Sequence, residues 1–66
     1  MDYFTIELRH GESKQVWIAC SETVEKAMEL AREAPEALPN ARAEAETLTS
    51  QPPFRLKPDT VKLWVP

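Results

Sequence analysis

The feature that most constrains this chain is the segment 21–34, with the sequence SETVEKAMELAREA. At about 100° per residue, its apolar and charged residues fall on opposite sides, which is the pattern of an amphipathic helix. Such an apolar stripe must be covered, and in a chain of 66 residues the alternating segments that flank it are the available cover. The stripe comprises Val24, Ala27, Met28, Leu30, Ala31 and Ala34.

Two alternating segments precede the helix. Residues 3–9, YFTIELR, predict a strand with Phe4, Ile6 and Leu8 on its buried side. Residues 10–13 contain the glycine of the chain and predict a hairpin turn. Residues 14–20, KQVWIAC, predict a second strand, and Ser21 is expected to cap the helix. In this interpretation Val16, Ile18 and Cys20 face the helix, while Gln15, Trp17 and Ala19 face away.

The segment after the helix has two interpretations. Pro35 is expected to end the helix. Residues 40–49, NARAEAETLT, have the composition of a second helix capped by Asn40, but they also alternate as a strand, which we favour narrowly. Residues 50–59 are rich in turn formers and predict a loop pinned by Phe54 or Leu56.

Residues 60–65, TVKLWV, predict a last strand with Val61, Leu63 and Val65 toward the helix. The expected fold is therefore α+β, as one domain over residues 1–66. A small antiparallel sheet of three or four strands, in the order β-β-α-β-β or β-β-α-α-β, carries one amphipathic helix across one face.

The predicted sheet has a second face that the helix does not cover, and the aromatic residues gather there. Exposed aromatic surface often marks an interface, and Trp, Tyr and Arg are frequent binding anchors. An external protein is the favoured occupant; a second copy of the chain, or the loop folding back, are the alternatives. The predicted contact residues on this face are Tyr3, Trp17, Trp64, Arg9 and Lys62.

Charge is the second guide to partners. The chain has 11 acidic and 8 basic residues, a formal charge of −3, and Glu25, Glu29 and Glu33 lie along the exposed side of the helix. This acidic stripe is expected to steer the chain toward a basic protein surface. The charge disfavours nucleic acid, although single-strand binding through stacked aromatics is kept as the alternative function. The longest apolar run, residues 16–20, is too short to span a membrane.

No catalytic, cofactor or metal signature stands out. His10 falls in the predicted turn and Cys20 at the far end of a strand, so they lack the hydrogen-bond reach that a nucleophile and its base need. We therefore expect a protein that is not an enzyme and holds no cofactor or metal. A lone cysteine is typical of a reducing compartment, which predicts the cytoplasm.

A hairpin that leads into the helix SETVEKAMELAREA resembles, over about half of the chain, the antidote proteins of the HicB type, which neutralise small RNA-cleaving toxins. The chain departs from that family because Cys20 leads directly to Ser21, without the family's proline and glycine signature. The resemblance implies an inhibitor. Small size and acidity are also typical of phage and plasmid accessory proteins that block host defence enzymes. The expected function is thus a protein-binding inhibitor or regulator that occludes its partner.

Overall fold

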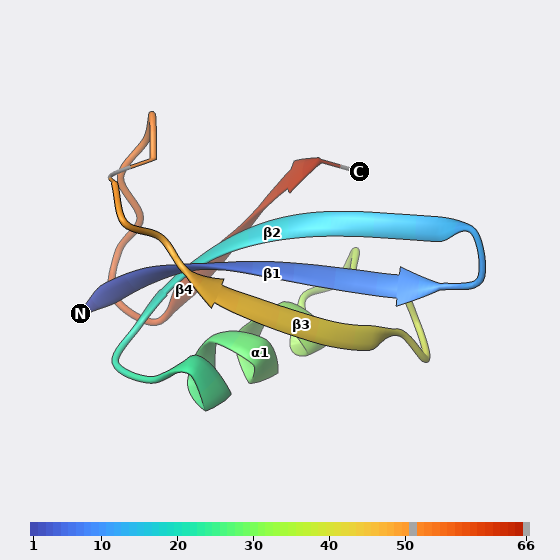
Figure 1. Cartoon of the computed structure of the whole chain (residues 1–66). Coiled ribbons are helices and arrows are strands. Elements are labelled where there is room, and N and C mark those ends of the chain that lie inside the picture. Colours follow the sequence, from blue (N-terminus) through green and yellow to red (C-terminus); the bar gives the residue numbers. More distant parts are fainter. Residues whose placement is uncertain (51, 66) are drawn as a thin grey trace.

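A four-stranded antiparallel sheet carries a single helix on one face, in a computed structural model that describes residues 1–50 and 52–65 (Figure 1). The sheet order is β3-β1-β2-β4, and every neighbouring pair is antiparallel. We call the face that α1 covers the inner face and the opposite one the outer face. The predicted α+β fold and its β-β-α-β-β order are confirmed. The elements are β1 (Asp2–His10), β2 (Ser13–Ser21), α1 (Val24–Glu33), β3 (Arg42–Thr47) and β4 (Thr60–Val65).

The β1–β2 hairpin is closed by a tight turn at Gly11 and Glu12, with His10 opposite Ser13. Gly11 has a φ of 62°, in the left-handed region that glycine adopts without steric cost. A type II′ hairpin turn places glycine at this first central position. The turn therefore sets the register of the hairpin, in which Ile6 lies opposite Trp17.

The predicted orientation of β2 is wrong. Residues directly opposite each other in an antiparallel pair point to the same face. Because Ile6 lies opposite Trp17 and Phe4 opposite Ala19, Trp17 and Ala19 belong to the inner face. Trp17 is 4% exposed and is part of the core cluster. The corrected outer-face residues of β2 are Val16, Ile18 and Cys20.

The indole N–H of Trp17 has a hydrogen-bond acceptor inside the fold. Its Nε1–H donates to Gln15 Oε1 at 3.1 Å, and the same oxygen accepts from the Leu38 amide at 2.7 Å. Gln15 Nε2 in turn donates to the Glu36 carbonyl at 2.8 Å. Gln15 thus ties the segment after α1 to the sheet and removes the cost of burying the indole N–H.

Small residues of α1 complete the inner core. Ala27 and Ala31 are fully buried, while Val24 and Met28 are partly buried against the cluster. Alanine at these positions leaves volume for the large Trp17 side chain under the helix. The buried cluster consists of Phe4, Ile6, Leu8, Trp17, Ala19, Ala27, Ala31 and Ala41.

The helix begins later than predicted, and its cap is Thr23. The Thr23 hydroxyl accepts from the Lys26 amide at 3.2 Å, whereas Ser21 belongs to β2 and donates to the Thr23 carbonyl at 2.7 Å. Ser21 is buried and completes the strand, so it is not available as a cap. Helix α1 ends at Glu33, and Ala34 is extended, as expected before Pro35.

We expect Thr23→Ala to lower the free energy of unfolding by about 1 kcal/mol, because the first turn of α1 loses its side-chain acceptor. Urea denaturation followed by circular dichroism measures the change. Thr49→Ala, an exposed threonine in the β3–β4 loop, is the matched control and should change stability by less than about 0.5 kcal/mol. Equal losses in the two variants would show that Thr23 does not cap the helix.

Residues 42–47 form strand β3, so the helical alternative for the segment 40–49 is wrong. Ala41 is buried, and Ala43 and Ala45 pack partly buried against the core. The high helix propensity of this segment is overridden because its alternating alanines complete the inner face beside β1.

The β3–β4 loop returns over the outer face. The Leu56 amide donates to Tyr3 Oη at 3.3 Å, and the Asp59 amide donates to the Cys20 carbonyl at 2.8 Å. Ile18 and Cys20 are therefore buried although they lie on the outer face. The central strand β2 is covered on both sides at this end of the sheet. In the described part of the chain, no helix is long and apolar enough to cross a membrane.

Candidate protein-binding surface

An aromatic pair stands at the β4 side of the outer face. The pairing of β2 with β4 shifts register between Val16 and Trp17, so that Trp64 is the extra residue of a bulge. Trp64 is 44% exposed and Val65 is 46% exposed. The bulge thus presents two adjacent apolar side chains to solvent.

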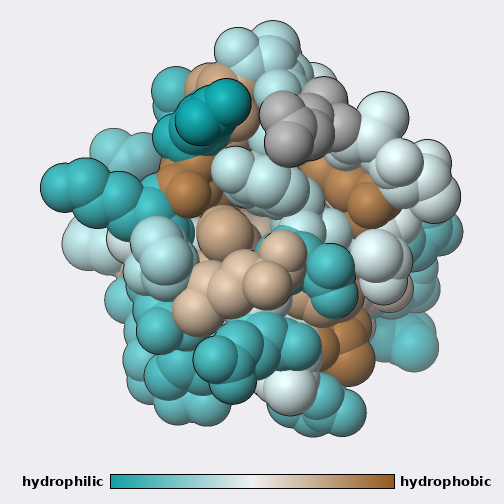
Figure 2. Space-filling view, turned by 90° about the vertical axis from the view of Figure 1, so that its left-hand side faces the viewer, coloured by the Kyte–Doolittle hydropathy of each residue, from teal (hydrophilic) through white to brown (hydrophobic). Residues whose placement is uncertain are grey.

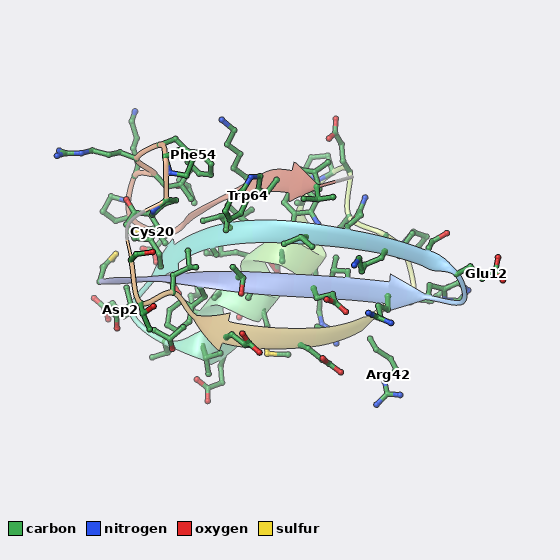
Figure 3. The ribbon with its side chains drawn as sticks, turned by 45° about the horizontal axis from the view of Figure 1, so that its top comes forward. Asp2, Glu12, Cys20, Arg42, Phe54 and Trp64 are labelled. Carbon is green, nitrogen blue, oxygen red and sulfur yellow. The ribbon has the colours of Figure 1, made fainter. Side chains whose placement is uncertain are left out.

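Phe54 and Lys62 flank Trp64. The Phe54 and Trp64 rings meet edge to face, with centroids 6.2 Å apart and an interplanar angle of 83° (Figure 3). Lys62 Nζ lies 4.5 Å from the Phe54 ring centroid, within the range of a cation–π contact. These contacts hold the indole in place while leaving much of it exposed. We call this surface the aromatic corner; it consists of Phe54, Lys62, Trp64 and Val65.

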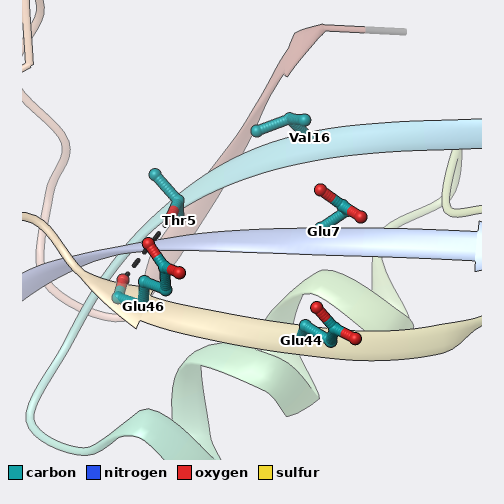
Figure 4. Close-up of a pocket in the computed structure, with 5 residues that line it drawn as sticks. All are labelled: Thr5, Glu7, Val16, Glu44 and Glu46. Atoms are coloured by element: carbon teal, nitrogen blue, oxygen red, sulfur yellow. Dashed lines mark hydrogen bonds between the residues drawn. The ribbon is translucent and has the colours of Figure 1, made fainter.

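A row of carboxylates lies beside the aromatic corner on the same face. Glu7 of β1 stands directly opposite Glu44 of β3, and Glu46 lies opposite Thr5 (Figure 4). Together with Val16 they line a shallow hollow of about 140 Å³. Val16 also lies opposite Val65, so it joins the hollow to the aromatic corner. We call this surface the acidic hollow; it is lined by Thr5, Glu7, Val16, Glu44 and Glu46.

The size and lining of the acidic hollow suit a side chain of a partner. Pockets for small ligands occupy roughly 300–1,000 Å³ and are mostly apolar. The hollow is smaller and carries three carboxylates, so a lysine or arginine from another protein fits its chemistry. Glu7 already has one cationic neighbour, Arg9, with which it forms an ion pair.

The predicted contact residues separate into three groups. Trp64, Lys62 and Arg9 lie exposed on the outer face as predicted. Tyr3 also lies there, but it is partly buried, and its hydroxyl accepts a hydrogen bond from the Leu56 amide of the β3–β4 loop. Tyr3 therefore holds that loop over the sheet and is not free to contact a partner. Trp17 is in the core and is withdrawn as a contact residue.

The helix carboxylates do not join this surface. Glu25, Glu29 and Glu33 are exposed on α1, which covers the inner face (Figure 1), whereas Trp64 lies on the outer face. The acidic stripe of the helix therefore lies apart from the aromatic corner, on the exposed side of α1 where the sequence placed it, and its role in steering stays a prediction. The acidic side chains that accompany the aromatic corner are those of the sheet.

Sequence reasoning missed Phe54, Glu44 and Glu46 as part of this surface. Phe54 belongs to a loop whose path depends on contacts with Tyr3 and Cys20, far away in sequence. Glu44 and Glu46 could have been found once residues 40–49 were treated as a strand, because alternation places them opposite the alanines.

Two further hollows of about 370 and 360 Å³ lie elsewhere on the described residues: the first adjoins the acidic hollow and is lined by Glu7, Arg9, Arg42 and Glu44, and the second lies beside the segment after α1. At the end with the N-terminus and the β3–β4 loop, hydrophobic atoms form separate small areas among hydrophilic ones (Figure 2). Within the described residues, no group of three or more His, Cys, Asp and Glu side chains could hold a metal ion. Comparisons with protein-family models, curated proteins and solved structures found no match, so the resemblance to HicB-type antidotes gains no support.

Proposed function

We propose that this chain is a protein-binding module that acts as an inhibitor or regulator by covering a surface of its partner. The observation that carries the proposal is the exposure of Trp64, a large aromatic held edge to face against Phe54 instead of being buried. Tryptophan is enriched among the residues that dominate binding energy. The proposal assigns no catalytic step, and the free Cys20 fits action in the reducing cytoplasm.

The acidic hollow defines the partner's chemistry. A partner that places an apolar side chain against Trp64 and a basic side chain between Glu7 and Glu44 would match both parts of the surface. Apolar contact at the corner supplies affinity, and the carboxylates supply orientation and faster association with a basic surface. Binding should therefore weaken as salt is raised.

We expect Trp64→Ala to lower partner capture at least about tenfold, since truncating a hot-spot tryptophan costs 2 kcal/mol or more. The measurement is quantitative capture by the immobilised chain from a lysate of its own organism, with the protein that depends on Trp64 identified by mass spectrometry. Its affinity is then measured with purified components.

Two variants control this experiment. Trp64→Phe keeps an aromatic ring and should retain part of the binding, while Glu29→Gln on α1 should retain all of it. Circular dichroism should show that the variants are folded. Capture by Trp64→Ala equal to that of the wild type would refute the proposal.

Single-stranded nucleic acid is a second candidate because basic residues surround the aromatic pair. Arg55 and Lys57 are exposed in the same loop as Phe54, and Lys62 lies over its ring. Bases stack on exposed aromatics next to basic grooves. A titration of Trp64 fluorescence with mixed oligonucleotides separates the candidates: strong quenching with a steep salt slope supports nucleic acid, and no response at low salt excludes it.

A further inference from the structure

Strand β3 has an open backbone edge. It is the last strand on its side of the sheet, and its pairing with β1 runs without a bulge from Thr47 to Arg42. The Leu48 amide donates to the Tyr3 carbonyl at 2.9 Å. Backbone groups in an antiparallel strand point alternately to its two sides. The backbone N–H and C=O groups of residues 42, 44, 46 and 48 therefore point toward β1. Those of the intervening residues, Ala43, Ala45 and Thr47, point away from the sheet.

The two edges of the sheet differ in their protection. Strand β4 carries the bulge at Trp64 and a lysine, Lys62, which are features that discourage pairing with another strand. Strand β3 has the sequence RAEAET, without lysine, proline or bulge. The alanines on its inner side are small enough to let another strand approach.

Two charges of β3 face like charges directly across the β1–β3 pair. Glu44 lies opposite Glu7, and Arg42 lies opposite Arg9, so both cross-strand pairs are of like charge. Like charges directly opposite each other in a sheet are destabilising. Among the described residues, Glu7 forms an ion pair with Arg9, and neither Arg42 nor Glu44 takes part in it. An opposite charge can reach these two side chains from beyond the β3 edge.

We propose that two copies of this chain pair through β3, antiparallel and related by a twofold axis at Ala43. This register places Arg42 opposite Glu44 of the second copy, and Glu44 opposite Arg42 of the second copy. In the new ladder these are non-hydrogen-bonded pairs, whose side chains come closest. Figure 3 shows Arg42 extending past the β3 edge, away from the other strands, where a second copy would lie.

The other registers that match the outward backbone groups are electrostatically worse. An axis at Glu44 pairs Arg42 with Glu46 of the second copy twice, but it also sets Glu44 against its own copy. An axis at Ala45 sets Glu44 against Glu46 twice. The axis at Ala43 pairs opposite charges twice and opposes no like charges among Arg42, Glu44 and Glu46. Charge complementarity therefore selects a second copy of this chain, in one register, as the occupant of the edge.

The pairing leaves the aromatic corner open but shares Glu44 with the acidic hollow, because Arg42 of the second copy would lie beside that carboxylate. A twofold axis perpendicular to the sheet keeps both helices on one side and makes one continuous sheet with four strands from each copy. The aromatic corners lie at the two far edges, on β4 of each copy. Sedimentation of the chain alone tests the pairing, and capture by Trp64→Ala tests the proposed function, so the failure of one is distinguishable from the failure of the other.

Sedimentation equilibrium of the purified chain tests the pairing. The mass of the wild type should rise with concentration from that of one chain toward that of two, with a dissociation constant of about 1 mM or lower. Arg42→Glu and Glu44→Arg should each weaken association at least about tenfold, because two attractive pairs become repulsive. An equimolar mixture of these two variants should associate again, since each supplies the charge that the other lacks.

Controls separate this interface from others. Arg55→Glu makes the same charge change as Arg42→Glu in the exposed loop and should leave association unchanged, as should Trp64→Ala. Circular dichroism checks that the single variants are folded. A wild type that stays monomeric throughout, an association insensitive to both charge variants, or a mixture that fails to associate would each overturn the proposal.

Discussion

Trp17→Ala should lower the free energy of unfolding by about 3–5 kcal/mol, the cost of truncating a buried large aromatic. The indole is 4% exposed within the cluster formed by the sheet and α1, and alanine would leave a cavity there. A chain of 66 residues has about 3–10 kcal/mol of stability in total. At 25 °C the variant is therefore expected to be largely unfolded, or folded in only about half of the molecules. Circular dichroism and urea denaturation measure the folded fraction.

Trp64→Ala is the matched control for this prediction, because it removes the same side chain from an exposed site. It loses the edge-to-face contact with Phe54, which is worth about 0.5–1.5 kcal/mol. The two variants should thus differ severalfold in destabilisation. Similar effects at the two positions would contradict the inner position of Trp17 and the outer position of Trp64.

Gln15→Ala should cost about 2–4 kcal/mol, the second-largest effect that we expect. The substitution leaves the Trp17 indole N–H and the Leu38 amide without their shared acceptor, and the Glu36 carbonyl without its donor. The indole N–H and the Leu38 amide are partly buried, and each such group left unpaired costs about 1–3 kcal/mol, whereas the Glu36 carbonyl is exposed and can bond to water. Urea denaturation measures the loss.

An NMR readout distinguishes this network from a general packing effect. In the wild type the Trp17 indole proton should exchange slowly and the Trp64 indole proton rapidly, since the first is hydrogen-bonded in the core. Gln15→Ala should accelerate exchange of the Trp17 proton. Lys14→Ala, at the exposed neighbouring position, should leave both exchange and stability close to those of the wild type.

The face on which Trp17 lies could have been predicted from the length of the hairpin turn. With Gly11 at the first central position of a two-residue turn, His10 lies opposite Ser13, and even-numbered residues of β1 face odd-numbered residues of β2. Ile6 then shares a face with Trp17. The uniform run of apolar residues from 16 to 20 carries no alternation of its own, so periodicity without this register could not orient the strand.

The candidate surface was partly predictable for a different reason. The outer position of Lys62 and Trp64 agrees with the predicted alternation of β4. The prediction that Val65 faces the helix is wrong, because the bulge at Trp64 turns Val65 to the outer face, opposite Val16. Phe54 reaches Trp64 because the loop is anchored at Tyr3 and Cys20, which are distant in sequence. Loop paths of this kind depend on long-range contacts that no local pattern encodes.

The sequence by itself determined the elements of this protein: an amphipathic helix, three of its strands and the turns between them, because periodicity and breaker residues are local signals. The tertiary structure decided between helix and strand for β3, since pairing beside β1 outweighed helix propensity. It also decided what covers each face of β2 and which charges meet across the sheet. Those outcomes depend on the packing of segments far apart in the chain, where burial energies exceed local preferences.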